Sequence, residues 1–140
     1  MNKLEVQQRV LQYGKPLDLD EFEWDEKTRT FSSDQRGLVL DFSGIDNCKF
    51  ITGFYCTFIT GFYCTFNTGS YCTFNTSSYC TFTTGSYCIF IIGNDYTLTP
   101  GAECVIIQQD PLNVIRPKKG DVIDVLRRGY LVNGKESCCK

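Results

Sequence analysis

Apolar residues recur with a period of eight through the middle of the chain. From Cys48 the sequence runs CKFITGFY, CTFITGFY, CTFNTGSY, CTFNTSSY, CTFTTGSY and CIFIIGND, which gives the consensus C-T-F-x-T-G-x-Y. Counting on by eights brings Gly101 to the sixth position and Cys104 to the first, and counting back puts Phe42 at the third. About nine units therefore lie between residues 40 and 111.

Each unit is predicted to be one short strand followed by one turn. Positions one and three share one face of an extended strand, whereas positions two and four point the other way. A helix cannot keep one buried stripe with this period, because residues eight apart lie about 80° apart around its axis. Thr, Tyr and Phe favour strands, and Gly followed by Ser or Asn at positions six and seven supplies the positive φ of a tight corner.

A unit of this size cannot bury its own Cys and Phe, so the units must stack. Two units per coil of about 16 residues predict a mainly β protein, a short two-sided β-solenoid of about four and a half coils. A meander of hairpins is the structural alternative. Alternate units fall on opposite sheets, which aligns Cys56, Cys72, Cys88 and Cys104 on one sheet and Cys48, Cys64 and Cys80 on the other.

The segment before the repeats is predicted to cover the open end of the solenoid. Asn2 and Glu5 form a capping-box pattern, and the apolar spacing that follows predicts a helix over residues 3–13. Residues 22–31 alternate like a small hairpin. Residues 1–39 are therefore interpreted as an N-terminal helix and hairpin cap.

The segment after the repeats is predicted to be a second cap. Residues 114–115 and 121–132, the latter broken near Arg128 and Gly129, read as terminal strands. The chain then divides into the N-terminal cap, a solenoid over 40–111 and a C-terminal β cap and tail over 112–140, all within one compact domain.

The nine cysteines are interpreted mainly as packing groups. Cys side chains stacked in parallel strands lie about 4.8 Å apart with parallel Cβ vectors, too far for an unstrained disulfide. Buried thiols are therefore expected, with disulfides or a bound metal as the alternatives. The vicinal pair Cys138 and Cys139 is expected to belong to a flexible tail.

Composition removes several classes of function. The chain has no His, which excludes His-dependent triads, Cys-His dyads and mixed Cys/His zinc sites. It shows no phosphate-binding Gly-rich loop and no helical metal motif, and burial raises the pKa of a thiol nucleophile. No enzymatic activity, metal or other cofactor is expected. Without a signal peptide or an apolar run of about 18 residues, a soluble, cytoplasmic protein with no membrane contact is expected.

Charge is distributed unevenly along a chain with a formal net charge of -2. Residues 1–47 carry ten acids and six bases, whereas residues 104–140 carry four acids and seven bases. These ends are interpreted either as solvated caps or as contact surfaces that steer a partner. The acidic cap comprises Asp18, Asp20, Glu21, Glu23, Asp25 and Glu26. The basic end, a candidate contact for nucleic acid or a partner, comprises Arg116, Lys118, Lys119, Arg127 and Arg128.

Two adjoining units carry apolar residues where the others are polar. Ile51 and Ile59 stand at position four, and Phe54 and Phe62 replace Ser at position seven. If these positions point outward, the four residues form an apolar patch that either contacts a partner or is covered by the N-terminal cap. The Tyr column at position eight either stabilises a corner by stacking on itself or stacks on sugars or bases.

The sequence as a whole resembles a known repeat family. The block YGKPLDLDEFEWDEKTRTFSS, then LVLDFSGIDNCKF, the tandem C-T-F-x-T-G-x-Y units and a closing CVIIQQD segment are similar to octapeptide-repeat proteins of bacteriophages, large DNA viruses and bacteria. The resemblance covers nearly the whole chain and implies a small, capped β-solenoid without a settled activity. The chain departs from the pattern at Phe54 and Phe62 and in its short, basic C-terminus.

These observations favour a non-enzymatic, phage-encoded protein-binding module that blocks or scaffolds a host protein, such as a defence nuclease complex. Rigid repeat surfaces bind at little ordering cost. The expected contact is the apolar patch with the acidic cap beside it, and the expected partner is a host protein or a second copy of the chain. The first alternative is a virion or tail-associated structural or glycan-binding element. The second is a nucleic-acid mimic or binder, which is not favoured because only one end is acidic.

Overall fold

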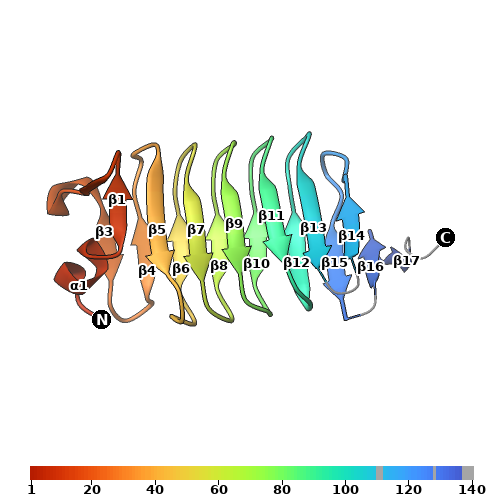
Figure 1. Ribbon diagram of the computed structural model, residues 1–140, viewed down its shortest axis with the longest axis horizontal. Coiled ribbons are helices and arrows are strands. Elements are labelled where there is room, and N and C mark those ends of the chain that lie inside the picture. The colour runs from red at the N-terminus through yellow and green to blue at the C-terminus, as the bar shows by residue number, and fades with distance from the viewer. Residues whose placement is uncertain (110–111, 128, 137–140) are drawn as a thin grey trace.

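The repeat units fold as strands that alternate between two facing sheets (Figure 1). The computed structural model describes residues 1–109, 112–127 and 129–136. In sheet A the parallel strands are β5 (Leu38–Phe42), β7 (Thr57–Thr60), β9 (Thr73–Thr76), β11 (Ile89–Ile92) and β13 (Val105–Gln109). In sheet B they are β4 (Thr30–Ser32), β6 (Lys49–Ile51), β8 (Thr65–Asn67), β10 (Thr81–Thr83) and β12 (Tyr96–Thr99).

This pairing confirms the two-sided β-solenoid of about 16 residues per turn, with about five turns. Phe50 aligns with Phe66, and Phe66 aligns with Phe82, so each strand lies in register with the strand 16 residues further along the chain. A hairpin meander would pair neighbouring repeat units antiparallel. The alternative of a hairpin meander is therefore excluded for these strands.

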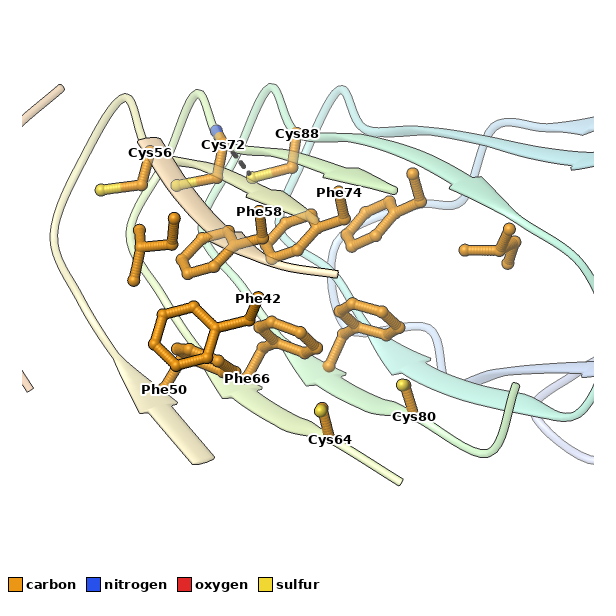
Figure 2. Packing of buried hydrophobic residues seen from close by; sticks show 14 of the residues in the cluster. Phe42, Phe50, Cys56, Phe58, Cys64, Phe66, Cys72, Phe74, Cys80 and Cys88 are labelled. Atoms are coloured by element: carbon orange, nitrogen blue, oxygen red, sulfur yellow. Dashed lines mark hydrogen bonds between the residues drawn. The ribbon is translucent and has the colours of Figure 1, made fainter. Parts of the chain in front are cut away.

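The core is a double row of Phe rings between the sheets (Figure 2). Within sheet B the rings of Phe66 and Phe82 are stacked with centroids 4.8 Å apart, and within sheet A Phe74 and Phe90 stack at 4.9 Å. Across the core, Phe66 and Phe74 meet edge to face at 5.2 Å. These rings therefore take the two arrangements that aromatic quadrupoles favour. They stack on Phe rings of the same sheet and meet Phe rings of the opposite sheet edge to face.

The cysteines form two ladders beside the Phe rows (Figure 2). The seven cysteines of the repeats are buried and free, as the packing interpretation expects. Their thiols donate to carbonyls of the corners; Cys88, for example, lies 3.6 Å from the carbonyl of Gly69 in the preceding coil. The sulfur of Cys88 also accepts the backbone N–H of Cys72 at 3.4 Å. Burial raises the pKa of the Cys48 thiol. The predicted tail pair, Cys138 and Cys139, lies outside the described residues.

The tight corners depend on the residue at position eight, not on the Gly at position six. The five Tyr residues at position eight have φ between 58° and 64°, whereas no Gly at position six has a positive φ. The prediction that Gly supplies the left-handed conformation was therefore wrong. Gly is required at position six only where successive corners stack closely, as at Gly101: its N–H donates to the carbonyl of Gly85 at 3.1 Å, which leaves no room for a Cβ.

The first coil differs from the predicted phase of the repeat. Leu40, not Phe42, aligns with Phe58, and Phe42 aligns with Thr60. The corner between β5 and β6 contains two extra residues and bends at Gly44, whose φ is 75°. The parallel ladder also begins earlier than residue 40, because β4 already pairs parallel with β6. The eight-residue count misplaced Phe42 because the two extra residues lie in a corner, where they shift the repeat along the sequence without disturbing the stacking of the strands.

The N-terminal cap is built mostly from strands. It contains α1 (Lys3–Gln7), β1 (Val10–Gln12), β2 (Lys15–Pro16), the 3₁₀ helix η1 (Leu19–Glu21) and β3 (Glu23–Asp25). The predicted capping box of Asn2 and Glu5 is present, but the helix ends at Gln7 and not at residue 13. From Val10 the chain pairs antiparallel with β5, since the open edge of sheet A offers it backbone partners. The predicted hairpin is confirmed, with β3 antiparallel to β4.

The C-terminal cap ends both sheets with strands, as predicted, and the structure shows that these strands pair antiparallel with the last coil. It contains β14 (Leu112–Ile115), β15 (Ile123–Leu126), β16 (Gly129–Val132) and β17 (Lys135–Glu136). β14 pairs with β13 in sheet A, and β15 pairs with β12 in sheet B, where β16 and β17 follow. Among the described residues no helix is long and apolar enough to cross a membrane.

Two glycines at the same repeat position test the stacking of the corners. A Cβ on Gly101 would lie 2.5–2.7 Å from backbone atoms of Gly85 and Ser86, whereas a Cβ on Gly93 meets nothing within 4 Å. Gly101→Ala should therefore lower the free energy of unfolding by about 1–3 kcal/mol. Gly93→Ala should leave it unchanged or raise it by up to about 1 kcal/mol. Denaturant unfolding of both variants measures the difference, and equal effects would contradict it.

The thiol ladders predict a second result. In a variant that carries Cys138→Ser and Cys139→Ser, the seven remaining thiols are all buried. A chromogenic aromatic disulfide should react with none of them in the native protein, because the reagent needs an accessible thiolate. After denaturation without reductant, all seven should react. A lower count in the denatured protein would show that disulfides are present.

Candidate interaction surfaces

The outer faces of the two sheets differ in polarity. Sheet B presents mainly hydroxyl and amide side chains, namely Thr30, Ser32, Lys49, Ile51, Thr65, Asn67, Thr81, Thr83, Thr97 and Thr99. Sheet A is mixed near its N-terminal end, with Val39, Asp41, Thr57, Ile59, Thr73 and Asn75. Beyond β9 the outward positions of sheet A are apolar on β11 and, apart from Gln109 at the end of the strand, on β13. The repeat thus builds one polar face and one face with an apolar half.

The apolar half of sheet A, called here the apolar face, spans β11, β13 and β14. Its residues are Ile89, Ile91, Val105, Ile107, Leu112 and Val114. Strand register makes them neighbours: Ile89 aligns with Val105, Ile91 with Ile107, and Ile107 with Val114. Val114 is 54% exposed and Ile89 is 43% exposed. Adjacent, unbroken apolar side chains on a flat sheet are typical of a protein contact.

Sequence reasoning missed the apolar face, although a signal for it was present. Ile89 and Ile91 occupy positions two and four of their unit, and Val105 and Ile107 occupy the same positions 16 residues later. In a two-sided solenoid, units 16 residues apart are neighbours on one sheet. The adjoining units that carry Ile51 and Ile59, by contrast, lie on opposite sheets.

The predicted patch is exposed but does not form one surface. Ile51 and Phe54 are 50% and 43% exposed, and Ile59 and Phe62 are 36% and 46% exposed, so the N-terminal cap does not cover them. Ile51 lies on β6 of sheet B, whereas Ile59 lies on β7 of sheet A. Phe54 and Phe62 lie on the corners that follow these two strands. The four residues therefore form two pairs, one associated with each sheet.

The structure brings Ile51 together with part of the acidic cap. An open surface hollow of about 420 Å³ is lined by Ile51, Ser32, Ser33, Asp34, Phe22 and the acids Asp20, Glu21 and Glu23. The acids of the cap are all exposed, but two of them also hold local structure. Asp25 accepts the backbone N–H of Lys27 at 2.9 Å, and Glu21 accepts the side-chain amide of Gln35 at 2.8 Å. The hollow joins two apolar side chains, Ile51 and Phe22, to a negative rim.

Each exposed Phe already has a partner within the chain. The guanidinium of Arg36 lies over the ring of Phe54, 5.3 Å from its centroid. The backbone N–H of Phe62 donates to the carboxylate of Asp46 at 2.8 Å. These contacts fix the corners and leave about half of each ring in contact with solvent.

The basic end is divided between two sides of the solenoid. Arg116, Lys118 and Lys119 line a hollow beside Glu103, in the loop that follows β14. Asp121 holds this loop by accepting the backbone N–H of Lys118 at 2.9 Å, and this hydrogen bond lowers the pKa of Asp121. Arg127 follows β15 at the opposite ends of the strands, and Arg128 lies outside the described residues.

The tyrosines stack on themselves along the corners. Tyr71 lies between Tyr55 and Tyr87 at centroid distances of 4.9 and 5.0 Å, and Tyr63 stacks on Tyr79 at 5.0 Å. At this spacing no sugar or base fits between two rings. The inner rings therefore present edges and hydroxyls, which fits the interpretation that the column stabilises the corner.

The described residues define a capped β-solenoid with exposed interaction surfaces. No group of three or more metal-ligating side chains occurs among residues 1–109, 112–127 and 129–136. Comparison of the chain with protein-family models, curated proteins and solved structures gave no match.

The exposure of Phe54 and Phe62 leads to a test of their role. Phe54→Ser and Phe62→Ser together should leave the fold intact and lower the free energy of unfolding by at most about 2 kcal/mol, because both rings lie half in solvent. Part of this loss comes from the contact of Phe54 with Arg36. Circular dichroism and denaturant unfolding measure it. Unfolding of the double variant would show that the two rings belong to the core.

Proposed function

We propose that this protein is a non-enzymatic protein-binding module and that the apolar face is its contact surface. The observation that carries the proposal is the contrast between the sheets. At equivalent outward positions β11 of sheet A has Ile89 and Ile91, whereas β10 of sheet B has Thr81 and Thr83. The same backbone therefore tolerates polar residues at these positions, and the fold does not require apolar ones on sheet A.

Energetics support a contact on this face. Ile89, Leu112 and Val114 are exposed, whereas Ile91, Val105 and Ile107 are partly buried. Fully removing one Ile or Val side chain from water contributes about 1.5–3 kcal/mol, so each of these side chains forgoes part of that energy unless a partner covers it. β11 and β13 beneath are held by ladders on both sides, and β14 is held by β13, so binding orders little backbone. A preorganised, flat, apolar surface suits a partner with an apolar surface of similar shape.

The resemblance to octapeptide-repeat proteins extends the proposal to the biological setting. We propose that the chain is phage-encoded and acts in the host cytoplasm by blocking or scaffolding a host protein, such as a defence nuclease complex. The absence of catalysis is part of the proposal. Its support is the lack of His in the sequence and the burial of the seven repeat thiols in the packed core.

Matched double variants test the proposed surface. Ile89→Lys with Ile91→Lys places two charges on the apolar face, and Thr81→Lys with Thr83→Lys places two charges on the equivalent positions of sheet B. Capture of a partner from bacterial lysate by the tagged protein, measured by mass spectrometry, should be lost in the first variant and kept in the second. Lysine is acceptable at such a position, since Lys49 occupies one on β6.

The same experiment separates the alternatives. The partner should be captured in a stoichiometric amount relative to the tagged protein, and its capture should persist after nuclease treatment of the lysate. Equal capture by both variants would show that the apolar face is not the contact. Capture that disappears on nuclease treatment would favour nucleic-acid binding, and a stable multimer without a captured protein would favour the structural alternative.

A further inference from the structure

The four terminal strands of the two sheets differ in how well they are protected against pairing with a strand of another molecule. An exposed strand edge offers unpaired N–H and C=O groups, and natural sheets block it with short strands, charges or Pro. β2 is two residues long and contains Pro16, and β17 is two residues long with Lys135. β3 carries Glu23 and Asp25. β14 reads Leu-Asn-Val-Ile, with no charge and no Pro, and it is the longest of the four described terminal strands.

Hydrogen-bond direction shows which backbone groups of β14 are free. In β13 the N–H of Val105 donates to the carbonyl of Cys88 at 3.0 Å, so Val105 directs its backbone groups toward β11. Because this direction alternates along a strand, Ile106 and Gln108 direct theirs toward β14.

The partners of these two residues in β14 are Ile115 and Asn113. The N–H and C=O groups of the alternate residues, Leu112 and Val114, consequently point away from β13 into the free edge. Their side chains lie on the apolar face, with Leu112 72% exposed and Val114 54% exposed. The edge and the apolar face are therefore continuous.

Sheet B extends further than sheet A at this end of the molecule (Figure 1). β14 and β15 are added to β13 and β12 of the last coil, so among the described residues β16 has no strand of sheet A opposite it. Tyr130 and Val132 of β16 pair with Val125 and Ile123, whose side chains are buried in the core, and are themselves only partly buried. A strand added to β14 would cover both side chains.

Positively charged side chains lie at both ends of the place where a strand added to β14 would run, called here the strand position. β14 runs toward Arg116, Lys118 and Lys119, which are exposed in the loop after it. Arg127 is exposed in the turn between β15 and β16, on the side where β14 begins. The strand position itself is apolar, because it is bordered by β14 and by the inner face of β16. An apolar strand with acidic ends complements this distribution of charge.

We propose that β14 is a docking edge for an extended segment of the partner protein, with alternating apolar residues and acidic residues at its ends. This inference rests on the proposed protein-binding function and specifies how the partner binds. The segment would pair with the free N–H and C=O groups of Leu112 and Val114, and it would place alternate side chains on Tyr130 and Val132.

Two substitutions at one residue isolate the backbone contribution. Val114→Pro removes an N–H that points into the free edge, a position where Pro is compatible with a strand. Val114→Ala removes similar apolar surface and keeps the N–H, so it is the matched control. Both variants should keep the unfolding midpoint of the wild type, because no bond between β13 and β14 uses this N–H.

The probe is a displayed library of peptides of about twelve residues, selected on the wild-type protein. Enriched peptides should alternate apolar and polar residues, carry net negative charge and bind more weakly at higher salt. Their affinity should fall about tenfold or more from Val114→Ala to Val114→Pro, because a strand hydrogen bond is lost and the ring blocks close pairing.

Other results would overturn the inference. These are equal affinity for the two variants, enriched peptides without the alternating pattern or the negative charge, and no enrichment at all. A wild-type dimer that Val114→Pro converts to a monomer in light scattering would assign the edge to a second copy instead. If the lysine variants of the apolar face abolish partner capture but the Val114 variants behave alike, only the strand addition fails. If the lysine variants leave capture unchanged, the proposal that the apolar face is the contact surface is wrong.

Discussion

The structure depends on parallel stacking of coils in register at the spacing of a β-ladder. Every coil must repeat the path of the one before it, so in the regular repeats each side chain lies on its counterpart 16 residues away. This constraint places Phe on Phe in the core and Tyr on Tyr at the corners. It also explains why a left-handed Tyr conformation, which costs about 1 kcal/mol or more by itself, persists at five corners: the aromatic stack and the corner hydrogen bonds hold it.

The same stacking creates the problem of the two ends. A solenoid whose terminal strands are unprotected can pair through them with other protein molecules. In this protein the first strand beyond the repeat strands runs antiparallel to them at both ends of both sheets. The reversal is accompanied by Pro16 in β2 and by charges in β3 and β17. β14 lacks these protections and adjoins the apolar face. The protected edges and the unprotected edge are therefore separated in space, with Pro or charged residues at the N-terminal edges and an unprotected β14 at the C-terminal end.

Function in such a fold depends on the outward positions, which carry no folding constraint beyond strand propensity. Thr on sheet B and Ile or Val on sheet A satisfy that propensity equally well. The difference in polarity between the two sheet faces is therefore not required by the fold, and it supports the proposed contact of the apolar face with a partner. The buried Cys and Phe positions serve the core, so the chemistry available to a partner is confined to the sheet faces, the corners and the caps.

The octad by itself indicated the strands, their two sheets, the Phe core and the buried thiols, because stacking two units per coil places like residues on one another; the parallel pairing excluded the hairpin meander. Three features were decided only by the tertiary structure. Residues 10–12 became a strand because the edge of β5 offered backbone partners. Tyr and not Gly took the positive φ, because stacked corners need the Gly position for close approach. Val114 joined Ile89 and Val105 on one face because β14 returns antiparallel beside β13.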